Sequence, residues 1–154
     1  MRIVAFDISI RNLGVAITED LNYIFSTNIK TLKVKKNRLL YIYEKSEEIV
    51  REFQPKIAVI EDVIYHKNIK TVILLGSVKG IIQLLLEKND IGIVEINPKS
   101  LKLSISGYGA SKKHQIQYMV KNVFKIEKEL SDHESDALAL IWTYISKYGL
   151  GTKR

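Results

Sequence analysis

Two short apolar runs, each ended by an acidic residue, constrain the fold of this chain most. Residues 3–6 are followed directly by Asp7, and residues 57–60 directly by Glu61. Continuous apolar runs of this length are typical of strands buried on both faces of a sheet. Asp7 is also the only acid among the first 18 residues. The pattern therefore predicts two central strands that each end at a carboxylate.

The rest of the chain separates into strand and helix patterns. Three strands are expected first, at 2–6, 13–17 and 23–29, in an antiparallel meander. Helices are then expected at 35–53, 71–88, 111–124 and from 131 onward, with strands at 56–60 and 91–96 and a helix start at Pro98. This order predicts an α/β fold with a mixed five-stranded β-sheet flanked by α-helices. The length fits one domain spanning 1–154. If strands 2–6 and 56–60 are neighbours, Asp7 and Glu61 meet at one end of the sheet.

The expected helix at 71–88 is apolar almost all round. Such a helix needs more than one buried face. It is either a core helix under the sheet or one whose far side packs on a second subunit, where Gly76 and Gly80 would allow a close approach. We expect no membrane-spanning helix, because no apolar stretch approaches about 20 residues.

A second pair of candidate ligands follows a predicted helix cap. Ser131 suits the cap position, with Glu134 completing a capping box. His133 and Asp136 are three apart and so share a helix face. Together with Asp7 and Glu61 they could hold two divalent cations about 3.5–4 Å apart, which can act on a phosphodiester. Plainer interpretations remain: Asp7 could cap a turn, and Glu61 could be a solvated strand end. His133 could be a helix-start residue without a ligand role, or Asp132 could be the ligand in its place.

The charge distribution favours an anionic partner. The net charge is +7, and residues 96–126 contain no acid. The lysines of that segment are Lys99, Lys102, Lys112, Lys113, Lys121 and Lys125. A segment of one sign attracts a polyanion such as nucleic acid, although it can also serve only as a solubilising surface. The absence of cysteine rules out disulfides and thiolate metal sites and fits a reducing cytosol.

Several short motifs occur in a specific order along nearly the whole chain. They are Phe6-Asp7 with Arg11 and Gly14; Phe53-Gln54-Pro55 and Ile60-Glu61; Lys67-Asn68, Leu75-Gly76 and Gly80; Lys102; residues 107–110, Lys113 and 115–120; and Asp132-His133 with residues 136–139. In this order and at these separations the chain resembles the RuvC family of Holliday junction resolvases, which have a ribonuclease H-like fold.

The resemblance implies a crossover junction endodeoxyribonuclease that acts as a homodimer on four-way or branched DNA in recombination and repair. It implies Asp7, Glu61, His133 and Asp136 as ligands of two Mg²⁺ ions, which Mn²⁺ could replace. Lys113, and with it Lys102, would neutralise charge on the scissile phosphate. The remaining DNA contacts implied or expected are Lys112, Ile64, Tyr65, Arg11 and Tyr108. We expect the protein in the cytoplasm of a bacterium, or of a phage-infected host; a branch-migration complex as partner stays open.

Two residues depart from the family pattern. Ser9 stands where glycine is usual, and serine does not share the freedom of glycine to adopt positive φ. Ile64, followed by Tyr65, stands where an aromatic residue often probes the junction centre, so sequence selectivity is expected to be relaxed. Two other functions compete: a broader branched-DNA endonuclease of phage type, and a non-catalytic junction-binding protein. A third, an actin-like ATPase, fits the first loop but needs a longer chain.

Overall fold

The computed structural model describes the chain except for residues 10, 32–35, 63–66, 107–112 and 151–154. Its strands are β1 (Arg2–Ile8), β2 (Asn12–Glu19), β3 (Asn22–Lys30), β4 (Ile57–Glu61) and β5 (Gly92–Ile96). Its helices are α1 (Arg38–Phe53), α2 (Ile69–Lys88), α3 (Pro98–Ser106), α4 (Lys113–Phe124) and α5 (Asp132–Tyr148). The predicted order of elements is confirmed.

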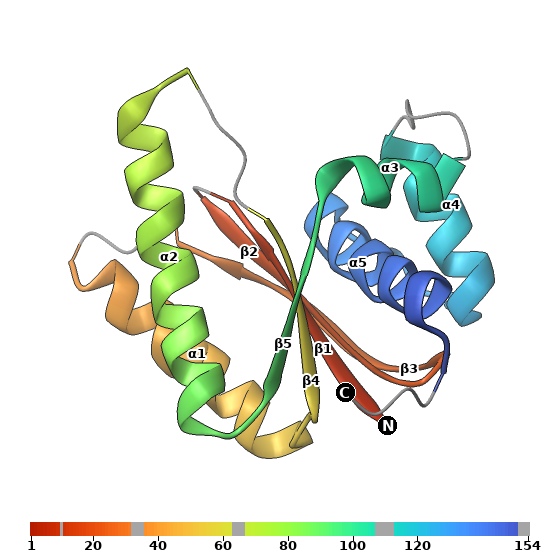
Figure 1. Ribbon diagram of the computed structural model, residues 1–154, viewed down its shortest axis with the longest axis horizontal. Helices are drawn as coiled ribbons and strands as arrows, with labels where there is room; N and C mark the ends of the chain where they lie inside the picture. The colour runs from red at the N-terminus through yellow and green to blue at the C-terminus, as the bar shows by residue number, and fades with distance from the viewer. Residues whose placement is uncertain (10, 32–35, 63–66, 107–112, 151–154) are drawn as a thin grey trace.

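The five strands form one mixed sheet in the order β3-β2-β1-β4-β5. β1 pairs antiparallel with β2 and parallel with β4, which confirms the assumed adjacency of β1 and β4. Helices α1 and α2 lie on one side of the sheet, and α3, α4 and α5 lie on the other (Figure 1). The arrangement is an α/β sandwich in which the central strands are covered on both faces.

Side-chain alternation along the central strands divides the core in two. Ile3 and Ala5 of β1, with Val59 of β4, pack in the cluster that contains α5. Val4 and Phe6, with the even-numbered residues of β4, pack in the cluster that contains α1 and α2. Because successive side chains point to opposite faces, Asp7 and Glu61 continue the α5 side of their strands. The continuous apolar runs are therefore explained by burial on both faces.

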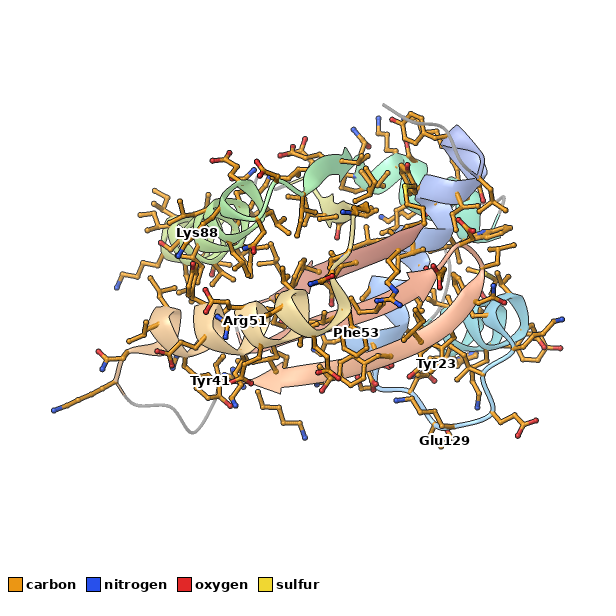
Figure 2. All side chains as sticks on the ribbon, turned by 90° about the horizontal axis from the view of Figure 1, so that it is seen from below. Tyr23, Tyr41, Arg51, Phe53, Lys88 and Glu129 are labelled. Atoms are coloured by element: carbon orange, nitrogen blue, oxygen red, sulfur yellow. The ribbon has the colours of Figure 1, made fainter. Side chains whose placement is uncertain are left out.

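Helix α1 begins at Arg38 and ends where the sequence predicts. Gln54 adopts a left-handed conformation with φ of 46° and donates its N–H to the carbonyl of Val50. Pro55 then prevents the helix from continuing. The buried face consists of Ile42, Ser46, Ile49 and Val50, whereas Leu39 is 37% exposed. Tyr41 and Phe53 lie on the side of α1 that faces β3 (Figure 2), and Phe53 stacks on Phe25 with ring centroids 5.1 Å apart.

Helix α2 buries only part of its apolar surface within this chain. Val78, Ile82, Leu85 and Leu86 face the sheet. Ile69, Ile73 and Leu84 are 73%, 63% and 58% exposed, respectively. A Cβ atom added at Gly76 or Gly80 would meet nothing within 4 Å among the described residues. Part of the apolar surface of α2, which in one of the two alternatives packs on a second subunit, is thus exposed in the single chain.

The expectation that no helix is long and apolar enough to cross a membrane was wrong, because α2 meets both conditions. An 18-residue window of α2 has a mean hydropathy of 1.8 and is 22% buried. The helix has charged residues only near its two ends, apart from Lys79. One such helix is weak evidence for a membrane-spanning segment, because core helices of soluble proteins can be equally long and apolar.

Candidate active site

The candidate site is built where β1 and β4 end side by side. Phe6 of β1 pairs with Ile60 of β4, and Asp7 and Glu61 are the next residues on their strands. The parallel pairing brings both carboxylates to one edge of the sheet. Both side chains are partly buried. The predicted meeting of Asp7 with Glu61 is confirmed.

Helix α5 brings the second pair of residues to the same place. Its first turn is fixed by the predicted capping box, in which Ser131 accepts from the N–H of Glu134 and the Glu134 carboxylate accepts from the N–H of Ser131. The Glu134 carboxylate also accepts from Ser26 of β3 at 2.7 Å and from Lys128 at 3.2 Å. Burial is the largest single effect and alone would raise the pKa of Glu134, but the hydrogen bonds together outweigh it and hold this pKa below its ordinary value. An ionised, buried Glu134 therefore anchors the start of α5 to the sheet.

Gly14 allows α5 to approach the sheet closely. Gly14 lies opposite Asp7 in the β1–β2 pair. A Cβ atom at this position would overlap the backbone carbonyl of His133. Glycine is required here by the close approach of the helix backbone, and this approach sets the distance between α5 and Asp7.

Asp7, His133 and Asp136 form a compact group. The Nδ1 atom of His133 lies 2.8 Å from Oδ2 of Asp7. One ligand atom from each of the three residues lies within 4.8 Å of the others. Glu61 lies outside this group of three, yet it is close enough to raise the pKa of Asp136. The four predicted residues are thus brought together, three of them at ligand spacing.

The site holds crowded carboxylates in a poorly solvated place. Burial, followed by the charge of Asp7, raises the pKa of Asp136 from 3.8 to about 7. Burial and Asp7 also raise the pKa of Glu61, against the lowering effect of Lys102. The hydrogen bond to Asp7 raises the pKa of His133 despite partial burial. Such shifts indicate that negative charge here lacks compensation, which is common at functional sites.

The donor set fits a divalent cation. Carboxylate oxygens suit Mg²⁺ and Mn²⁺, and a neutral imidazole suits Mn²⁺ in addition. A cation would also provide the positive charge that the raised pKa values of Glu61 and Asp136 show to be needed. The residues present therefore fit a metal centre, whose ligands would be Asp7, His133 and Asp136, with Glu61 adjoining.

Three of the predicted DNA-contacting residues lie around this edge of the sheet. Lys102 is exposed on α3 and near enough to Glu61 to lower its pKa. Lys113, at the start of α4, is exposed and lies 3.4 Å from Asp132. Arg11 is exposed in the turn between β1 and β2, where its carbonyl accepts hydrogen bonds from Thr31. Lys102 thus lies near Glu61, Lys113 lies near the start of α5, and the backbone of Arg11 lies just beyond the end of β1.

The other predicted contacts lie outside the described residues. They are Ile64, Tyr65, Tyr108 and Lys112. Ser9, by contrast, is described: its hydroxyl donates to the carbonyl of Asn12 and accepts from the N–H of Asn12. Ser9 is not among the described residues with positive φ. The Ser9 side chain therefore closes the turn after β1, and Ser9 itself does not adopt left-handed geometry.

Three features of the site have no clear signal in the sequence. Asp132, weighed above as an alternative ligand, instead accepts from Gln117 at 2.8 Å and pairs with Lys113. Glu134 was predicted as a cap, but its contact with Ser26 spans 108 residues. Lys79 of α2 points at Asp62, next to Glu61. Each is a long-range contact, and the chain pattern alone does not specify such pairs.

Comparison with known proteins identifies the family. The sequence model described as crossover junction endodeoxyribonuclease RuvC matches residues 3–144. The RuvC protein of Carboxydothermus hydrogenoformans is 30% identical over 155 residues, covering 97% of this chain and 98% of that protein. The RuvC protein of Dictyoglomus turgidum is 39% identical over 111 residues, covering 71% of this chain and 70% of that protein.

A solved structure shares the fold. It is that of T. thermophilus RuvC in complex with a Holliday junction substrate, with a TM-score of 0.87, 20% identity, and coverage of 99% of this chain and 97% of that one. The fold is therefore that of RuvC, as the sequence resemblance implied. The family model and the full-length relative show that this chain belongs to the RuvC family, the crossover junction endodeoxyribonucleases.

Proposed function

We propose that this chain is a metal-dependent endonuclease that resolves Holliday junctions through Asp7, Glu61, His133 and Asp136. The observation that carries this proposal is the compact group of Asp7, His133 and Asp136 at the end of β1, with Glu61 beside it. Membership of the RuvC family supplies the reaction: cleavage of crossover junctions in DNA. A binding protein without catalysis would gain nothing from four acidic or imidazole groups beside phosphate.

Each residue has a role that follows from its surroundings. When bound, two Mg²⁺ ions would activate a water for attack on phosphorus and stabilise the leaving oxygen. His133 must be neutral to act as a ligand. Asp7, which accepts from its Nδ1, would then orient the ring. Lys102 beside Glu61 is placed to offset charge on the phosphate.

Lys113 is held near the site by a contact that DNA can replace. The side chain of Lys113 is 79% exposed and that of its partner Asp132 is 44% exposed. A solvated pair of this kind contributes little to stability, so the lysine can turn to a phosphate at small cost. Lys113 would then hold the DNA backbone next to the acidic group, with Lys112, Arg11 and Tyr108 as further contacts.

The substrate and assembly follow from the family and from α2. We infer four-way or branched DNA as substrate, because that is what the T. thermophilus relative holds. We infer a homodimer, in which the exposed residues Ile69, Ile73 and Leu84 of α2 meet a second copy. A two-fold dimer would present two such sites to a nearly two-fold symmetric junction. The relatives are bacterial proteins, which supports action in bacterial cytoplasm.

The proposal is tested by separating binding from cleavage. Asp7→Asn, Glu61→Gln and Asp136→Asn should each lower Mg²⁺-dependent nicking of a synthetic four-way junction by roughly 100-fold or more, since each removes charge at the metal centre. Junction affinity should hold or rise, because repulsion from phosphate falls. Glu48→Gln on α1, an exposed acid in an i,i+3 pair, is the matched control. Wild-type nicking rates in all three variants would contradict the assignment.

His133 has a separate test. Exchange of His133 for aspartate should retain activity. It should also weaken the loss of activity at acid pH, because the wild-type imidazole stops binding metal when it becomes protonated and the variant has no imidazole. Exchange for alanine should reduce activity with either Mg²⁺ or Mn²⁺. An alanine variant that is fully active with both ions would reduce His133 to a structural residue of the helix start.

A further inference from the structure

Lys79 is the only charged residue of α2 between Lys70 and Glu87, and it faces two acids. Its Nζ lies 3.5 Å from Oδ1 of Asp62 and 3.2 Å from Oε1 of Glu95. The side chain of Lys79 is only 12% exposed. One ammonium therefore joins a helix, the end of β4 and strand β5.

Asp62 connects this contact to the candidate site. It directly follows Glu61, and its N–H donates to the carbonyl of Ile96 on β5 at 2.9 Å. By strand alternation Glu61 faces α5, whereas Asp62 faces α2. Main chain and side chain of Asp62 are thus held by different elements, and both contacts restrict the backbone that positions Glu61.

Glu95 is likewise held both by its strand and by side chains of α2. Strand β5 places Glu95 opposite Ile60 of β4, one pair before Glu61. Its carboxylate lies 3.3 Å from Nε2 of Gln83, one turn after Lys79 on α2. The contact is therefore a small network between α2 and two strands, and Lys79 is its one cation.

Lys79 differs from the exposed ion pairs of this chain. Lys45 and Glu48, for example, are 45% and 64% exposed, and pairs of this kind contribute little. Lys79 has lost most of its contact with water and has two acceptors instead. Loss of its charge would leave Asp62 and Glu95 facing each other beside Glu61, whose pKa is already raised by burial and by Asp7.

We propose that Lys79 is a positioning residue of the nuclease site: it fixes Asp62 against α2 and β5 and thereby holds Glu61 in place. This inference rests on the proposed function. Lys79 acts through Asp62 and touches neither the metal ligands nor, at 12% exposure, the DNA backbone. It contributes to the chemical step and not to substrate affinity.

A purely electrostatic role of Lys79 predicts the opposite change in divalent-cation affinity when the lysine is removed. If Lys79 acted only as a counter-charge, its removal would make the site more negative and strengthen divalent-cation binding. If Lys79 positions Glu61, its removal weakens cation binding, because one carboxylate is no longer held at the site. Cation affinity without DNA therefore separates the two roles.

The variants are Lys79→Met, which keeps the length of the side chain, and Lys79→Arg, which keeps the charge. Lys45→Met is the matched control. Mn²⁺ binding is measured by calorimetry on the DNA-free protein, and kcat and KM are measured on a synthetic four-way junction with Mg²⁺. We expect Lys79→Met to bind Mn²⁺ about tenfold more weakly and to lose roughly tenfold to 100-fold in kcat, as small displacements of reacting groups do. KM should stay within about twofold, and Lys79→Arg should recover most of both losses.

Asp62→Asn tests the contact from its other partner. Asp62 is 56% exposed, so its exchange should fold even if Lys79→Met does not. It should weaken Mn²⁺ binding and lower kcat in the same direction. Unchanged kcat and Mn²⁺ affinity in both variants, or tighter Mn²⁺ binding at unchanged kcat, would overturn the proposal. A wild-type protein that binds Mn²⁺ but does not nick junctions would refute the proposed function, whereas weaker Mn²⁺ binding by Lys79→Met would still support positioning.

Discussion

Removal of one carboxylate from the site should stabilise the metal-free protein. Asp136 is the suitable one, because its pKa is raised from 3.8 to about 7. A raised pKa means that the native state binds a proton more tightly than the unfolded chain does. The free energy of unfolding must then fall as the pH rises from about 4 to about 7.

The size of the effect follows from the shift. Three units of pKa at 1.36 kcal/mol each correspond to about 4 kcal/mol, as an upper limit. The charges of Glu61 and His133 also act on the pKa of Asp136, so part of the shift belongs to the group as a whole. We therefore expect Asp136→Asn to be about 2–4 kcal/mol more stable than the wild type at pH 8, and about equal to it at pH 4.

The assay measures the free energy of unfolding in urea at pH 4, 6 and 8, with a chelator present to keep the protein metal-free. His133 should add to the loss in the wild type, because a histidine with a raised pKa contributes stability that disappears as the pH rises through its folded pKa. Saturating Mg²⁺ at 100 times its Kd should restore about 2.7 kcal/mol to the wild type at pH 8 and less to the variant. Parallel stability curves for the two proteins, with equal responses to Mg²⁺, would refute the reasoning.

Three further predictions concern positions around the site. Gly14→Ala should destabilise the protein by about 1–3 kcal/mol and abolish most cleavage, because the new Cβ overlaps the His133 carbonyl; urea unfolding and junction nicking measure this. Ile73→Glu on α2 should shift the protein from dimer to monomer in sedimentation at micromolar concentration, whereas an unshifted dimer would place the interface elsewhere. Lys113→Gln should lower the slope of log K against log salt concentration by roughly 0.9 on duplex arms, and an unchanged slope would mean that Lys113 makes no phosphate contact.

The sequence predicted the fold well because local patterns specified it. Apolar runs identified the central strands β1 and β4, and Ser131 with Glu134 gave the start of α5. Pro55 gave the end of α1. Each of these signals lies within a few residues of its effect. The adjacency of β1 and β4 was an assumption that the sheet confirms, since strand order depends on contacts between distant segments.

The residues of the candidate site could be proposed from the sequence, but only some of their contacts could be predicted. Asp7, His133 and Asp136 could be chosen because chemistry and spacing mark them. The partners of Lys79 and Asp132 could not, because a lysine or an aspartate has many possible partners on a folded surface. The buried face of α1 could not be predicted for a related reason. The periodicity of α1 allows two adjacent apolar faces, and packing selects the one with Ile42.

The contact between His133 and Asp7 joins residues 126 positions apart. During synthesis, Asp7 leaves the ribosome long before Asp136 has been made. The β1–β2 hairpin can pair early, but its acidic end acquires the imidazole and the third carboxylate only when α5 docks on Gly14. If these residues hold the metals, as proposed, a nascent or truncated chain without α5 would be unable to cut DNA. The topology would then delay nuclease activity until nearly the whole chain has folded.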